Sequence, residues 1–158
     1  MSEIVLARID DRLIHGQVMT SWVQYSGGNH IVIVDDFTAQ DEFLKPILKM
    51  AVPVGIGLDI FNIEQGIEYL TKLEGGNKII VLAKTPETFY NLIEGGVQLK
   101  EIIVGGMGAS SNRSKFYKNI SASNEERETF KKILDHGVKV TIQIIPAEKS
   151  VSADAILK

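Results

Sequence analysis

Short runs of apolar residues alternate along this chain with longer segments in which apolar residues recur every three or four positions. The short runs are rich in isoleucine and valine, which is typical of buried β-strands. We expect strands at residues 4–9, 31–34, 54–60, 78–83, 102–104 and 138–145. The periodic segments predict helices at residues 16–26 and 38–51, after the cap residues Asn62, Thr85 and Ser123, and within residues 147–158.

Residues 38–51 predict one continuous helix that ends before Pro53, because proline cannot continue a helix. Its apolar residues follow the i, i+3, i+4 spacing that places them on one face. They are Phe43, Leu44, Ile47, Leu48 and Ala51. We expect this face to pack against the core.

The longest polar stretch of the chain, residues 105–115, follows the strand at 102–104. Residues 116–121 then predict a further strand of mixed exposure. Ser123 and Glu126 have the spacing of a capping box, in which each side chain satisfies a backbone N–H of the other residue. This box starts a helix that we expect to reach His136.

Strands that alternate with helices indicate βαβ units, and hence a mostly parallel sheet covered by helices on both faces. In such open sheets, ligands bind outside the carboxyl ends of the strands. Three polar loops follow strands here, at residues 9–14, 35–37 and 105–115. If the first strand is central, these loops meet at one site.

The chain has 158 residues, no cysteine and a formal charge of −3. This length fits one domain, residues 1–158. The lack of cysteine excludes disulfides and thiol nucleophiles, and the weak negative charge argues against nucleic acid as a partner. The first residues do not have the pattern of a signal peptide, so we expect no leader sequence. No apolar run reaches the roughly 20 residues that a membrane helix needs, so we expect a cytoplasmic protein without membrane insertion.

Neither a metal nor a nucleotide cofactor is expected. The three histidines lack the spacing of metal ligands. The chain also lacks the third glycine of a dinucleotide-binding motif and the Gly-Lys pair of a phosphate-binding ATPase loop.

The reactive side chains of the first third gather in residues 7–18, ARIDDRLIHGQV. Here a helix begins with the backbone amides of Ile14, His15, Gly16 and Gln17. Amides in the first turn lack intrahelical acceptors and form a site for an anion, strengthened by the helix dipole. Arg12 adds a planar fork matched to phosphate oxygens, and Arg8 adds a second positive charge.

His15 is therefore placed where a phosphate would be held. Arg12 and the helix terminus should disfavour the protonated ring, and a neutral imidazole has a lone pair that can attack phosphorus. Asp10 or Asp11 could accept the other ring N–H and fix the tautomer. From spacing alone, an equally good interpretation is that the aspartates cap the helix and His15 is an ordinary residue at its start.

This segment closely resembles the active-site segment of the mannose–sorbose class of IIB proteins of the sugar phosphotransferase system (PTS). The resemblance extends over nearly the whole chain. Further matching segments are residues 34–36 (VDD), 40–41 (QD), 84–97 (KTPETFYNLIEGGV), 104–107 (VGGM) and 137–138 (GV). The order and separation of the histidine motif and the later glycine loop make the resemblance specific.

The resemblance implies a three-layer α/β/α domain with one antiparallel strand in an otherwise parallel sheet. It implies that His15 accepts a phosphoryl group on Nδ1 from a IIA protein or domain. The group then passes to a sugar brought in by the membrane components IIC and IID. Arg12 and the amides of residues 14–17 would hold the phosphate, and Asp10 would orient the loop. Compatible sugars are N-acetylgalactosamine, mannose, fructose and sorbose.

A possible second loop of the site consists of Gly105, Gly106 and Met107. We interpret it as a tight turn that packs close to the His15 loop. The stretch after it is small and polar, and varies within the family. The resemblance therefore assigns no role to Asn112, Arg113 or Lys115.

Other polar residues fit structural roles. His30 opens a buried strand, and His136 lies in the last turn of a helix, where a partly charged histidine suits the helix dipole. Trp22 fits the core. Asp35 and Asp36 either shape the rim of the site or stop a strand.

Two other functions remain open from the sequence. A histidine phosphatase also places a histidine after the first strand of an α/β sheet, but it normally has arginine immediately before that histidine, where this chain has Ile14. It also needs a second catalytic histidine. The other candidate is a non-catalytic module that binds an anion at the helix N-terminus without covalent capture.

Overall fold

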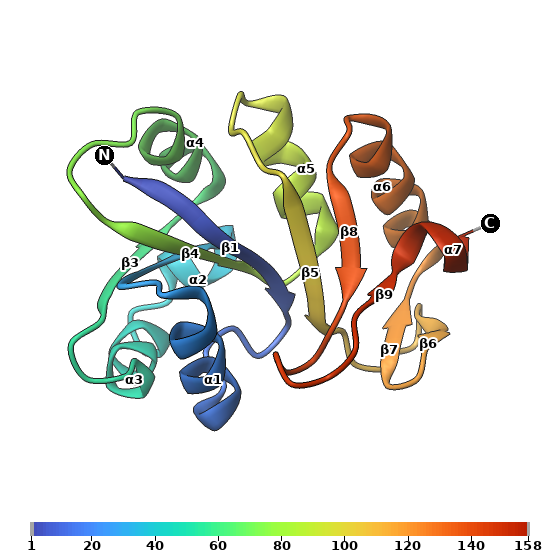
Figure 1. Ribbon diagram of the computed structural model, residues 1–158, viewed down its shortest axis with the longest axis horizontal. Helices are drawn as coiled ribbons and strands as arrows, with labels where there is room; N and C mark the ends of the chain where they lie inside the picture. Colours follow the sequence, from blue (N-terminus) through green and yellow to red (C-terminus); the bar gives the residue numbers. More distant parts are fainter. Residues whose placement is uncertain (1, 158) are drawn as a thin grey trace.

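In the computed structural model, which describes residues 2–157, β1 is the central strand of a seven-stranded sheet. The strands are β1 (Glu3–Asp10), β2 (His30–Val34), β3 (Gly57–Phe61), β4 (Lys78–Ala83), β5 (Glu101–Gly106), β8 (Lys139–Ile142) and β9 (Val151–Ser152). They lie in the order β3-β2-β4-β1-β5-β8-β9 (Figure 1). Neighbouring strands pair in parallel, except that β9 runs antiparallel to β8.

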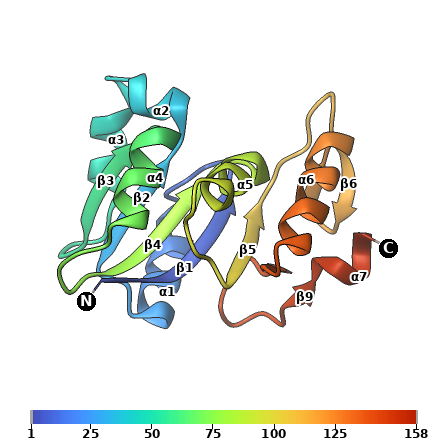
Figure 2. The ribbon, with the colours of Figure 1, turned by 90° about the horizontal axis from the view of Figure 1, so that it is seen from above.

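Helices cover both faces of this sheet. They are α1 (Gly16–Ser26), α2 (Asp36–Gln40), α3 (Leu44–Ala51), α4 (Ile63–Thr71), α5 (Pro86–Glu94), α6 (Asn124–Asp135) and α7 (Ala153–Leu157). One core forms under α1 and α3, where Met19, Trp22 and Leu48 are buried against the sheet. The opposite core lies under α4, α5 and α6 (Figures 1 and 2). The predicted three-layer fold is confirmed. Within residues 2–157, no helix is both long and apolar enough to cross a membrane.

The starts of α1, α4, α5 and α6 agree with the sequence prediction, because they depend on local chemistry, although the predicted cap Thr85 makes no side-chain capping bond. Both Asn62 and Ser123 form complete capping boxes, with Gln65 and Glu126 respectively. Two strands are shorter than predicted. β3 begins only at Gly57, after a turn in which the Ile56 amide bonds the Pro53 carbonyl. β8 ends at Ile142, because the next side chain, Gln143, turns to the carbonyls of Pro146 and Glu148.

The prediction of one helix over residues 38–51 is wrong. Asp41 ends α2, and its carboxylate accepts the amides of Phe43 and Leu44, both at 3.0 Å, so that a second helix, α3, begins. The new helix axis buries Leu48 but turns other apolar residues of the predicted face to solvent. Phe43 is 89% exposed and Ile47 61% exposed.

The single strand predicted at residues 116–121 is also wrong. This segment belongs to an antiparallel hairpin of β6 (Ser114–Tyr117) and β7 (Ile120–Ala122), which forms a separate two-stranded sheet. Lys118 makes the turn with a positive φ of 48°. The hairpin packs on α6, where Phe116 stacks on Phe130 with ring centroids 5.8 Å apart.

We predict that Asp41→Ala lowers the free energy of unfolding by about 1 kcal/mol, because it removes the carboxylate that accepts the Phe43 and Leu44 amides at the start of α3. Urea denaturation measures this change. Glu42→Ala is the matched control, since Glu42 makes a 3.4 Å surface ion pair with Lys45 and should contribute at most about 0.5 kcal/mol. Equal effects of the two changes would contradict the capping role.

Candidate functional site

Two of the three polar loops predicted to meet come together at the carboxyl end of β1. In the sheet, β1 lies between β4 and β5, and Asp10 is in register with Gly106. The loop that carries His15 therefore lies directly beside the loop after β5. The third polar loop follows β2, which is separated from β1 by β4. This loop contacts the end of β4, where Lys84 Nζ lies 3.5 Å from the Asp35 carboxylate.

A tight turn presents His15 at the start of α1. The Leu13 amide bonds the Asp10 carbonyl at 2.9 Å, and Leu13 adopts a positive φ of 59°. This conformation costs a non-glycine residue about 1–2 kcal/mol. The Leu13 side chain is only 2% exposed, and burying a leucine contributes about 1.5–3 kcal/mol, so the turn is stable.

The helix then begins at Gly16, next to the His15 ring. His15 is the N-cap residue of α1, and its side chain makes no capping bond. The side chain of Ile14 is buried in the core, whereas Gly16 and Gln17 are exposed. The first turn of α1 is therefore open to solvent beside His15, and the first amides of a helix have no intrahelical acceptors, which favours an anion there.

Asp10 is the centre of the loop. Its side chain is fully buried and accepts bonds from Arg8 Nη1 at 2.8 Å, the Arg12 amide at 2.9 Å, Arg12 Nε at 3.1 Å and Arg12 Nη2 at 3.3 Å. Burial alone would raise the pKa of Asp10, but the bonds from Arg12 and Arg8 outweigh it, so the pKa lies below its ordinary value. Asp10 is therefore a carboxylate at neutral pH.

Arg8 lies behind the loop and is 0% exposed. Burial lowers its pKa, and the bond to Asp10 opposes this shift. Its other contacts are the Ile144 carbonyl, 3.0 Å from Nη2, and the Trp22 ring, 5.7 Å away. Arg8 thus has the geometry of a loop-orienting residue, and the structure does not present it to a ligand.

Arg12 joins this buried pair to the histidine. Its Nη1 lies 3.1 Å from His15 Nε2. A guanidinium carries only donors, so Nε2 accepts and the proton of the neutral ring is on Nδ1. Nδ1 is buried and has no hydrogen-bond partner in the part of the chain that the structure describes.

The expectation that Asp10 or Asp11 accepts a ring N–H of His15 is wrong. Asp10 acts on the ring through Arg12. Asp11 faces the second loop, where its Oδ2 accepts the Gly108 amide at 2.8 Å and Arg113 Nη1 at 3.4 Å. Its carboxylate therefore joins the two loops.

The end of β5 fits against the His15 loop because it has glycines at two positions. A Cβ on Gly105 would overlap the Arg8 guanidinium, and one on Gly106 would lie 2.7 Å from Asp10 Oδ1. Met107 is buried, and its carbonyl accepts the Ser121 amide at 2.8 Å. Gly105 and Gly106 thus pack close to the His15 loop, as we expected. The interpretation as a tight turn is wrong, because the two glycines continue β5 and Gly106 pairs with Asp10 of β1.

Two contributors to the loop were missed by sequence reasoning. The Ile144 carbonyl accepts both Arg8 Nη2 at 3.0 Å and the indole N–H of Trp22 at 2.9 Å. Trp22 was predicted to be in the core, and it is, but its ring also covers Arg8. A backbone carbonyl leaves no signal in the sequence. The tryptophan does, because a buried indole N–H usually needs a hydrogen-bond partner.

The remaining candidates have structural partners away from the His15 ring. Asp35 caps α2 by accepting the Thr38 amide at 2.9 Å, and Asp36 accepts the Ile63 amide at 2.9 Å. His30 Nε2 lies 2.8 Å from Asp59. His136 bonds the carbonyl of Lys132 through Nδ1 at 2.8 Å. Across residues 2–157, no group of three or more His, Cys, Asp or Glu side chains has the arrangement of a metal site.

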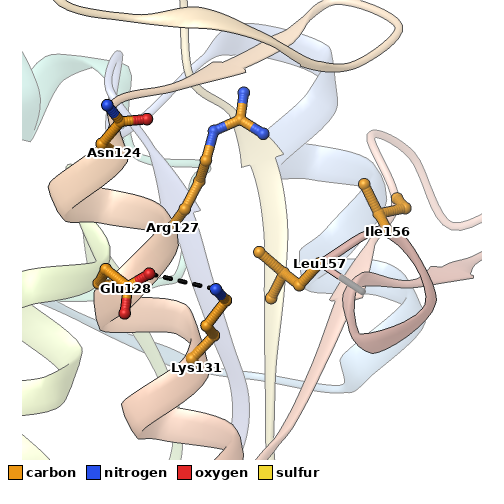
Figure 3. Close-up of a pocket in the computed structure, with 6 residues that line it drawn as sticks. All are labelled: Asn124, Arg127, Glu128, Lys131, Ile156 and Leu157. Atoms are coloured by element: carbon orange, nitrogen blue, oxygen red, sulfur yellow. Dashed lines mark hydrogen bonds and ion pairs between the residues drawn. The ribbon is translucent and has the colours of Figure 1, made fainter.

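A surface groove of about 370 Å³ lies between α6 and α7 (Figure 3). It is lined by Asn124, Arg127, Glu128, Lys131, Ile156 and Leu157. Lys131 pairs with Glu128 at 3.1 Å, and Arg127 bonds the Lys115 carbonyl at 3.0 Å. Its lysine and arginine are thus engaged with protein groups, and no residue of the His15 loop lines it, so we do not assign the reactive site to this groove.

Residues 4–158 match the family model of the PTS system sorbose subfamily IIB component. The N-acetylgalactosamine-specific phosphotransferase enzyme IIB component 1 of Escherichia coli K12 is 34% identical over 147 residues, which are 92% of this chain and 93% of that protein. The mannose-specific EIIAB component of E. coli K12 is 32% identical over 98% of this chain, but only 46% of that longer protein is covered. The crystal structure of the IIBSor domain of the sorbose permease from Klebsiella pneumoniae has a TM-score of 0.93 at 26% identity, with 98% of this chain and 96% of that chain covered.

We predict that Gly105→Ala lowers the free energy of unfolding by about 3 kcal/mol or more, because the new methyl group would displace Arg8 and break its buried ion pair with Asp10. Urea denaturation measures this loss. Gly76→Ala is the control, since nothing lies within 4 Å of a Cβ there and the change should be within about 0.5 kcal/mol. A Gly105 variant as stable as the control would disprove the close packing of the two loops.

We also predict that the neutral ring of His15 carries its proton on Nδ1 in the resting protein. Long-range ¹H–¹⁵N NMR correlations distinguish the two tautomers directly. In Arg12→Ala, the donor to Nε2 is lost and the Nε2–H form should become populated. His136 serves as an internal control, because its Nδ1 donates to a carbonyl and its tautomer should not change. An Nε2–H ring in the unmodified protein would refute the Arg12 contact.

Proposed function

This chain belongs to the sorbose subfamily of PTS IIB components, and from that premise we propose that it carries a phosphoryl group on His15 between a IIA partner and the incoming sugar. IIB components of this family are phosphotransferases.

The observation that carries the proposal is the contact of Arg12 with the His15 ring at the start of α1. It places a fixed positive charge and the start of a helix beside one imidazole. Phosphoryl transfer depends mainly on position and on charge stabilisation, which is what such an arrangement supplies. Arg12 is half-exposed, so its guanidinium can meet the oxygens of an incoming phosphoryl group.

The transfer step exchanges one nitrogen–phosphorus bond for another. The bond to the donor imidazole breaks and its electron pair stays on the donor ring. The new bond forms to the unprotonated nitrogen of His15. A donor ring that is protonated on its second nitrogen leaves as a neutral imidazole, while His15 keeps its own proton on the nitrogen that does not react. No proton has to be removed by a separate base.

Acceptance on Nδ1, which the family resemblance implies, requires a rearrangement from the resting state. In that state Nδ1 is buried and Nε2 accepts the bond from Arg12. The proton must move to Nε2, and Arg12 must leave this nitrogen. The guanidinium is then free to bond phosphate oxygens, together with the amides of residues 14–17.

The partners follow from the family. We propose that a IIA protein donates the group, which is supported by the name of the mannose relative, an EIIAB component of which this chain matches less than half. The acceptor complex is proposed to consist of the membrane components IIC and IID, as the resemblance implies. The names of similar proteins specify N-acetylgalactosamine, mannose and sorbose, so we assign the choice of sugar to the partners rather than to the His15 loop.

A histidine phosphatase is not favoured by the positions of the other histidines. His30 is engaged with Asp59, and His136 lies at the end of α6 near Glu94. Neither faces the His15 loop to act as a second catalytic group.

We predict that His15→Ala abolishes phosphorylation when the protein is incubated with radiolabelled phosphoenolpyruvate, the upstream carriers and the IIA partner. The label on the unmodified protein should be lost in acid and stable in base, as expected for phosphohistidine. His136→Ala, which removes an exposed histidine, should be labelled normally. Label that persists in a folded His15→Ala protein would disprove the assignment.

A further inference from the structure

Arg113 connects three segments that are far apart in the sequence. Its Nε and Nη2 bond the two carboxylate oxygens of Glu126 at 2.9 and 2.8 Å. Its Nη1 bonds the Gly108 carbonyl at 3.0 Å and lies 3.4 Å from Asp11 Oδ2. The Arg113 side chain is only 12% exposed, so its guanidinium is committed to these protein groups.

The Glu126 end of this bridge is firmly anchored. Glu126 is the third residue of α6 and forms the capping box with Ser123. Its carboxylate accepts the Ser123 amide at 2.9 Å, and its own amide bonds Ser123 Oγ at 3.0 Å. The paired contact with Arg113 is the strong, planar type of charge-assisted bond. It raises the pKa of Arg113, which therefore stays charged.

The other end of the bridge reaches the reactive loop. Asp11 lies between Asp10 and Arg12, the two residues that hold the His15 ring in place. Besides Arg113, its carboxylate holds the Gly108 amide at 2.8 Å. A displacement of Asp11 would be transmitted along the backbone to Arg12, because the residues are adjacent.

We propose that Arg113 is a positioning residue for phosphoryl transfer, which holds the His15 loop against α6 through Asp11 and Gly108. This inference rests on the proposed function of His15. It assigns Arg113 an effect on the rate of transfer and none on the recognition of the IIA partner, since its contacts are internal. A misplacement of about 1 Å can cost two orders of magnitude in rate, so loss of this bridge should be measurable.

The test measures the rate of transfer from phosphorylated IIA to the full chain as a function of IIA concentration. We expect Arg113→Ala to lower kcat about tenfold and to leave KM for IIA unchanged. Arg113→Lys retains the charge but not the planar fork, and should recover part of the rate. The matched control is Arg127→Ala, because Arg127 also binds the β6–β7 hairpin from α6, through Ser114 and Lys115, but does not touch the His15 loop.

Asp11→Asn is the second variant. It weakens the link to the loop without altering the bond between Arg113 and Glu126, so it keeps the test valid even if Arg113→Ala does not fold. It should reproduce a loss in kcat, and the double variant should lose little more than either single variant, because the two residues act as one unit.

The outcomes separate this inference from the proposed function. A protein that is not labelled on His15 at all would refute the proposed function. If the unmodified protein is labelled, but Arg113→Ala and Asp11→Asn transfer as fast as Arg127→Ala, the positioning role is overturned. A rise in KM at constant kcat would also overturn it.

Discussion

One buried carboxylate holds the reactive loop together. Asp10 is inaccessible to solvent and accepts bonds from Arg8 and Arg12. A buried charge that lacks partners costs several kcal/mol, so the fold has to supply all of these donors. This constraint explains why Arg8 points inward from β1, and why glycines stand at positions 105 and 106, where side chains would collide with the ion pair. It also explains why a backbone carbonyl, that of Ile144, turns toward Arg8.

The same carboxylate links the stability of the core to the presentation of His15. Arg12 is bound to Asp10 through Nε and Nη2, which leaves Nη1 to meet the ring. A guanidinium held in this way is already ordered, so the binding of an anion to it costs little conformational entropy. Preorganised charge of this kind is the main contribution that a protein can make to phosphoryl transfer.

The sequence predicted those features that depend on neighbouring residues. The strand–helix alternation, the start of α1 after His15 and the capping box at Ser123 all rest on contacts within a few positions. The helix break was missed because the apolar spacing fits a helix on either side of Asp41, and the side-chain cap decides where it begins again. The apolar side chains of Phe43 and Ile47 were consequently assigned to the core, although they are exposed.

Features that depend on distant residues could not be predicted in this way. Side chains alternate between the two faces of a strand, but this alternation does not determine whether the Arg8 side chain is buried or exposed. Its partners are Asp10 and the Ile144 carbonyl after β8. The family resemblance was informative for His15 but gave no role to Arg113, whose partners lie in the first loop, the second loop and α6. Charge-assisted contacts between separate loops cannot be predicted until the position of β5 beside β1 in the sheet is known.

The resting state also constrains how a phosphoryl group can arrive. If it arrives on Nε2, it takes the place that Arg12 Nη1 now occupies. If it arrives on Nδ1, the ring must turn to expose an atom that is now buried, and the Arg12 contact breaks as well. In both cases Arg12 has to leave the ring, and its bonds to Asp10 would keep its charge beside the proposed phosphate. The Arg12–Asp10 bonds are separate from the Arg12–His15 contact, so under the proposed function one arginine would serve both the free and the phosphorylated ring.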